Sequence, residues 1–258
     1  MSPLTLLPLL ALAALVSLAA AGLLLVAGQV APQLSAHLAF ALGIMPLILA
    51  AMSYFVPVLT RSAAAGFGLW WPPLLAWSGG VLAVHAFAGD FSSPLLGLAA
   101  SLAGVAAAGL GGWALYRARH MFGPRHRGLD WYLAALGCLL LALIAVILMP
   151  RFPEHRNALR LFHLHANLLG FVGLTALGTL QVLLPTCMGR PDPDAAVRLR
   201  RDLKWAVAGV LLISLGAALG NRAGIRIAVL GTALYGWVVL GMLGGWRRRF
   251  GRDLVRMH

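Results

Sequence analysis

The sequence predicts an all-α polytopic membrane protein, and three features carry that prediction. Hydrophobic residues make up 61% of the 258 residues, charged residues make up 10%, and the mean hydropathy is +0.88. Apolar runs of about twenty residues, the length that crosses a bilayer core, recur along the whole chain. The basic residues lie between these runs, where membrane proteins keep their cytoplasmic anchors. The net charge of +13 therefore does not indicate nucleic-acid binding, because no separate basic domain carries it.

Eight apolar runs predict eight transmembrane helices. The first run begins without a positively charged segment and another run follows it closely, so we expect a membrane helix there and not a signal peptide. In chain order the expected helices cover residues 5–27, 35–59, 70–89, 94–116, 131–149, 159–187, 204–220 and 226–246.

The distribution of arginines predicts the orientation of these helices. Fifteen basic residues fall on one side, at Arg61, in the 117–127 and 190–204 segments and in the 247–256 tail. Only five fall on the other side: Arg151, Arg156, Arg160, Arg222 and Arg226. Because loops rich in basic residues stay inside, we expect both termini to be cytoplasmic, in the cytoplasmic (inner) membrane of a bacterium.

An internal repeat relates the two halves of the chain. Twenty residues separate His37 from Pro57, and twenty separate His165 from Pro185. These pairs, like Trp77 and Trp205, are offset by 128 residues, half of the chain. The sequence therefore predicts two parallel four-helix repeats, residues 1–128 and 129–258, that form one membrane domain. A pseudo-two-fold axis along the membrane normal would relate them and place His37 and His165 at equal depth.

Four histidines near the outer ends of helices are the candidate metal ligands: His37, His85, His163 and His165. Ionisable groups inside a membrane are costly and mark functional sites. For His85 a simple hydrogen bond to a neighbouring backbone carbonyl is an equal alternative. His37 and His165, related by the repeat, are expected to hold one haem iron between them. His163 and His165 point about 200° apart on one helix, so they would serve different sites.

A haem carries two propionates, and arginine pairs well with carboxylates. Arg222 and Arg226 lie in a short hairpin on the side of the predicted haem site, so we expect them to bind the propionates. The alternative is that both are interfacial anchors.

The helix that begins with His163-Leu-His165 and ends in Pro185-Thr-Cys-Met-Gly-Arg190 resembles the tenth helix of haem–copper oxidase subunit I. The segment from His37 through Pro57 resembles the second helix of that family. The resemblance implies that His165 and His37 hold a low-spin haem, that His163 holds a high-spin haem, and that Arg222 binds propionates. The family has twelve core helices and a histidine pair at its copper site, both of which this chain lacks. The chain also resembles the shorter NnrS-type haem and copper proteins, which likewise have histidine-rich membrane helices.

These observations predict a membrane cytochrome b that transfers electrons within a respiratory or oxidoreductase complex. We expect one haem b, with a second haem as an alternative; copper is a further alternative, although no set of ligands in the sequence supports it. As an enzyme, the chain would be an oxidoreductase subunit. A quinone or a periplasmic cytochrome c would be its redox partner. Two alternatives stay open: a nitric oxide or other gas-binding protein with a second centre at His163, and a factor that handles haem or copper.

Overall fold

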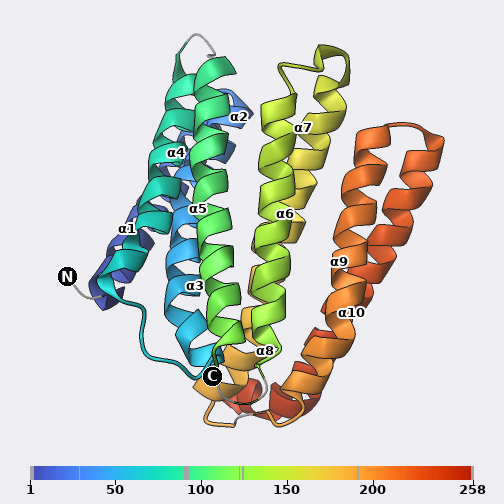
Figure 1. The fold of residues 1–258 in the computed structure, drawn as a ribbon. Coiled ribbons are helices and arrows are strands. Elements are labelled where there is room, and N and C mark those ends of the chain that lie inside the picture. The colour runs from blue at the N-terminus through green and yellow to red at the C-terminus, as the bar shows by residue number, and fades with distance from the viewer. Residues whose placement is uncertain are drawn as a thin grey trace.

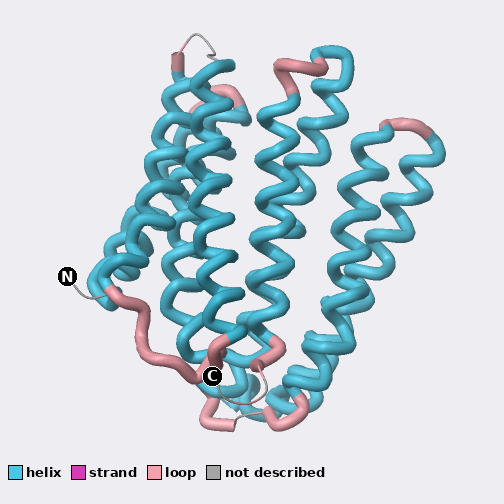
Figure 2. The backbone as a smooth tube through the Cα atoms, in the orientation of Figure 1, coloured by secondary structure: helices cyan, strands magenta, loops and turns pink. Residues whose placement is uncertain are grey.

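The computed structural model describes residues 3–28, 30–89, 93–121, 123, 125–190 and 192–256, and it is built from helices that run roughly alongside one another (Figures 1 and 2). No strand occurs in these described residues. The all-α prediction is confirmed.

The first half of the chain forms four helical rods, of which the second changes its winding part-way. The π-helix η1 interrupts that second rod directly after His37. The elements are α1 (Pro3–Val26), α2 (Pro32–His37), η1 (Leu38–Ile44), α3 (Met45–Leu59), the 3-10 turn η2 (Phe67–Trp70), α4 (Trp71–Ala88) and α5 (Ser93–Arg119).

The second half also forms four helical rods, with its 3-10 turn before the second rod and not after it. Its second rod is again interrupted by a π-helix, η4, which follows directly after His165. The elements are α6 (Gly128–Leu148), the 3-10 turn η3 (Pro153–His155), α7 (Arg156–His165), η4 (Ala166–Gly173), α8 (Leu174–Cys187), α9 (Ala195–Leu219) and α10 (Arg222–Arg256).

Seven of the helical rods in the described residues are long and apolar enough to cross a membrane. They agree with a polytopic membrane protein. The remaining rod, α4, has 18 residues and opens with Pro72 and Pro73. The count of eight spans, the repeat of 1–128 in 129–258 and the cytoplasmic termini stay predictions. The seven spans are Leu6–Val26, Pro32–Leu59, Pro94–Arg119, Gly128–Leu148, Pro153–Cys187, Ala195–Leu219 and Arg222–Arg249.

The two halves meet along α5 and α6, which lie side by side in the centre of the molecule (Figure 1). Small residues line this contact on α5: a Cβ atom on Gly111 would lie 3.7 Å from the Leu136 side chain of α6. Close packing of helices through small side chains is typical of membrane proteins. Within the halves, α4 packs on η1 and α5, whereas α9 packs on α7 and α10.

The ends of the bundle differ in charge. The α5–α6 and α8–α9 connections and the C-terminal end of α10 gather at the lower end in Figure 1. These segments contain most of the arginines. The α6–α7 and α9–α10 connections lie at the opposite end, as do α2 and α7. The candidate histidines of α2 and α7 therefore lie away from the arginine-rich end.

Candidate functional site

Each predicted haem-ligand helix changes from α to π winding directly after a histidine. His37 is the last residue of α2 and His165 is the last residue of α7. The π segments begin at Leu38 and Ala166, which are 128 residues apart, the offset of the sequence repeat. Since π segments are rare and are frequent at functional sites, their place beside both histidines marks this end of the bundle as the candidate site.

His37 is partly buried and its ring is oriented by two contacts. Its Nδ1 lies 2.7 Å from the carbonyl oxygen of Gln33, one helical turn earlier. Its ring packs against Phe87 of α4, with 4.4 Å between the ring centroids. With Nδ1–H donating to that carbonyl, Nε2 keeps its lone pair for another partner.

His163 faces His37 across the bundle. Their ring centroids are 6.5 Å apart and their ring planes differ by 8°. Nδ1 of His163 lies 3.0 Å from the carbonyl oxygen of Ala142 on α6, and the Asn167 amide lies 3.3 Å from the same nitrogen. The Ala142 carbonyl of a neighbouring helix therefore orients the His163 ring. The Gln33 carbonyl of its own helix orients the His37 ring in the same way.

His165 is the predicted partner of His37 on the haem, whereas the histidine ring that faces His37 in the structure is that of His163. Nδ1 of His165 lies 2.8 Å from the Leu161 carbonyl oxygen of its own helix. Because His163 and His165 are about 200° apart around α7, His165 points away when His163 faces His37. Among the described residues, no ring contact joins His37 to His165.

The remaining candidates lie outside this pair. His85 is exposed in the last turn of α4. Arg222 and Arg226 are exposed in the first turns of α10, whose packing is on α9. Among the described residues neither arginine forms an ion pair, and no group of three or more histidine, cysteine or carboxylate side chains could hold a metal ion.

Two histidines alone are a small donor set for a bare metal ion. The 6.5 Å between the ring centroids of His37 and His163 is within the reach of two imidazoles that share one metal. Packed aromatic rings reach the same spacing, so the distance alone does not select a metal. Metal-bound histidines donate their other ring N–H to a carbonyl, as Nδ1 of His37 and of His163 can do here. A haem macrocycle supplies the further donors that two histidines lack.

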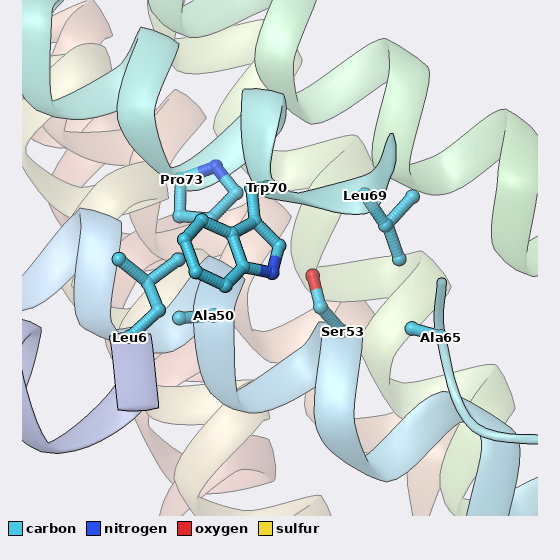
Figure 3. A pocket seen from close by; sticks show the side chains of 7 residues that line it. All are labelled: Leu6, Ala50, Ser53, Ala65, Leu69, Trp70 and Pro73. Atoms are coloured by element: carbon cyan, nitrogen blue, oxygen red, sulfur yellow. The ribbon is translucent and has the colours of Figure 1, made fainter. Parts of the chain in front are cut away.

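A small pocket elsewhere in the bundle is separate from the histidines. The Ser53 hydroxyl and the Trp70 indole face one another across it, with Leu6 and Pro73 beside them (Figure 3). Ser53 follows His37 by sixteen residues, about 24 Å along an α-helix. The pocket therefore takes no part in the candidate site.

Comparison of the chain with protein-family models, curated proteins and solved structures finds no match. The haem assignment therefore depends on the residues and their geometry.

Sequence reasoning missed the residues that support the histidines. Asn167 follows His163 by four residues, so both share a helix face, and that spacing is a readable signal. Ala142 and Phe87 contribute a carbonyl oxygen and a ring face. Nothing in their residue types distinguishes them from other apolar positions.

Proposed function

We propose that this chain is a b-type cytochrome of the bacterial cytoplasmic membrane, with one haem iron held by His37 and His163 near the outer face. The single observation that carries the proposal is the pair of facing imidazoles, 6.5 Å apart, with both Nδ1 atoms beside backbone carbonyls. The resemblance to haem–copper oxidase subunit I suggested His165 in the place of His163. If His163 holds the iron, His163→Ala should lose the bis-histidine signal and His165→Ala should retain it. If His165 holds the iron, the two variants should behave in the opposite way.

The protein residues would bind and orient the haem. His37 and His163 would hold the iron, and the carbonyl oxygens of Gln33 and Ala142 would accept hydrogen bonds from their Nδ1–H groups. A bis-histidine haem supplies a one-electron redox couple and leaves no open position for a substrate, which suits electron transfer. Arg222 and Arg226 remain the proposed partners of the propionates.

An electron carrier of this kind would work within a larger respiratory or oxidoreductase complex. A quinone or a periplasmic cytochrome c is the proposed redox partner. The exposed apolar side chains of α1 and α10, such as Leu23 and Leu240, leave these faces open to lipid or to another subunit.

A reduced-minus-oxidised spectrum with a pyridine haemochrome assay on the purified full-length protein tests this function. We expect one haem b per chain with a low-spin bis-histidine spectrum in the wild type, and loss of that spectrum in His37→Ala. His155→Ala, in the exposed turn beside Glu154, is the matched control and should retain the spectrum. A wild-type protein without haem would refute the proposal.

The gas-binding alternative predicts a different coordination state. A five-coordinate iron at His163 would bind carbon monoxide in the reduced protein, whereas a bis-histidine iron would not. Carbon monoxide titration of the reduced protein therefore separates these two functions. Metal analysis that finds copper in the purified protein would favour the haem- or copper-handling role.

A further inference from the structure

Tyr235 of α10 reaches past α9 to the π segment that follows the histidines of α7. Its hydroxyl donates a hydrogen bond to the carbonyl oxygen of Leu169, at 3.3 Å. Leu169 lies within η4, 66 residues from Tyr235 in the chain. The main packing of α10 is on α9, so this hydrogen bond is a specific link from the outermost helix to the histidine-bearing rod.

Two glycines on two different elements leave room for this contact. A Cβ atom on Gly209 of α9 would lie 2.9 Å from both the backbone nitrogen and the Cβ of Tyr235. A Cβ atom on Gly173 of η4 would overlap the phenolic oxygen itself. The glycine at 209 lets α10 approach α9 at Tyr235, and the glycine at 173 lets the phenol reach the η4 backbone.

The bonded carbonyl belongs to the element that sets the rotation of α7. In a π-helix the backbone hydrogen bonds run from i to i+5, and such segments are short and uncommon. η4 has eight residues and continues directly from His165. Because α and π turns rotate by different amounts per residue, a change of winding in η4 would turn α7 relative to α8. His163 would then leave its position opposite His37.

We propose that Tyr235 is a positioning residue for the haem site: its hydroxyl holds η4 in the π-helical register that directs His163 toward His37. This inference rests on the proposed function, because the consequence of the register is the geometry of the axial ligands. Among the described residues no ring contact joins Tyr235 to either histidine, so Tyr235 acts through the η4 backbone.

The test compares Tyr235→Phe with Tyr116→Phe in the purified haem-loaded protein. Tyr116 on α5 is exposed, so its variant makes the same chemical change away from the site. We expect Tyr235→Phe to shift the haem midpoint potential and the low-spin electron paramagnetic resonance g-values, because axial-ligand geometry tunes both. Tyr116→Phe should match the wild type in both.

A second pair of variants tests the contact from the opposite side. Gly173→Ala should displace the phenol and shift the same two signals. In the double variant Gly173→Ala/Tyr235→Phe the added methyl faces a ring carbon at 3.5 Å, an ordinary contact, so the double variant should be more stable than Gly173→Ala alone.

A wild-type haem signal that neither Tyr235→Phe nor Gly173→Ala alters would overturn the positioning role and leave the cytochrome assignment intact. A wild-type protein without haem would overturn both.

Discussion

At the scale of single residues, the site depends on how two imidazoles are held in an apolar bundle. His37 and His163 each have Nδ1 beside a backbone carbonyl, which favours the tautomer protonated at Nδ1, and the Asn167 amide nitrogen lies 3.5 Å from Nε2 of His163. The sequence identifies both histidines, because ionisable groups are rare inside membranes. It does not decide between His163 and His165 as the partner of His37. That choice depends on the rotation of α7, which packs on α6 and α9 and continues into η4.

A histidine outside the membrane gives the first prediction. Nδ1 of His126 accepts a hydrogen bond from the Gly128 backbone N–H at 3.0 Å, at the start of α6. Burial lowers the pKa of His126 below its ordinary 6.5, and the positive charge of Arg61 lowers it further. The unfolded chain then binds the proton more readily than the folded protein. The stabilisation that neutral His126 gives the folded protein is complete above pH 6.5, the ordinary pKa of histidine. It is lost as the pH falls from there through the lowered pKa of His126 in the folded protein.

Thermal unfolding in detergent at pH 7.5 and at pH 5.5 measures this effect. The wild type should lose more thermal stability on acidification than His126→Asn, whose side-chain oxygen can still accept the Gly128 N–H but does not titrate. Equal losses in the two proteins would show that His126 does not contribute to the acid sensitivity.

At the scale of elements, the sequence located the helices more accurately than their winding or their ends. The expected helix at 204–220 begins at Ala195 in the structure. The charged residues before 204 suggested a loop, but Arg201 pairs with buried Asp202 at 2.6 Å within the helix. The π segments η1 and η4 could not be predicted, because a local change of winding leaves the hydrophobic pattern almost unchanged.

The crossing of α4 over η1 gives an element-scale prediction. A Cβ atom on Gly80 would overlap the backbone of η1 at Ala41, so Gly80→Ala should push α4 away from η1. Because Phe87 of α4 packs on His37, the displacement should lower both thermal stability and haem occupancy. Overpacking of this kind costs about 1 to 3 kcal/mol.

Gly104→Ala on α5 is the matched control, because a Cβ atom at Gly104 meets nothing within 4 Å. It should be neutral or should stabilise the protein by up to about 1 kcal/mol, since alanine favours a helix. Unfolding curves and haem-to-protein ratios of both variants provide the measurement. A Gly80→Ala protein as stable as Gly104→Ala would contradict the close crossing.

At the scale of the whole molecule, each half contributes four helical rods, and the two halves do not form a closed ring. They meet along α5 and α6, whereas α1 and α10 lie at opposite edges of the bundle (Figure 1). Composition was enough to predict the all-α membrane fold. The sequence also predicts that His37 and His165 face each other across a two-fold axis. That prediction depends on how the two halves pack together, and the repeat alone does not contain this information.

The predicted orientation can be tested with the native cysteines. Cys187 is exposed at the end of α8, toward the arginine-rich end of the bundle, whereas Cys138 is buried. With that end in the cytoplasm, a membrane-impermeant maleimide should label Cys187 in inverted membrane vesicles and not in intact spheroplasts.

Cys187→Ser should abolish this labelling. That result would show that Cys138 does not contribute to the labelling. Glu154→Cys in a Cys187→Ser background places a thiol in the α6–α7 connection and should give the opposite pattern. Labelling of Cys187 in intact spheroplasts would reverse the orientation.

The central claim is that His163, and not His165, is the partner of His37 on the haem. Low-spin electron paramagnetic resonance spectra of purified His163→Ala and His165→Ala, each with its haem content, test it most directly. The geometry predicts that His163→Ala loses the bis-histidine signal and that His165→Ala retains it. A bis-histidine signal that persists in His163→Ala and disappears in His165→Ala would contradict the claim.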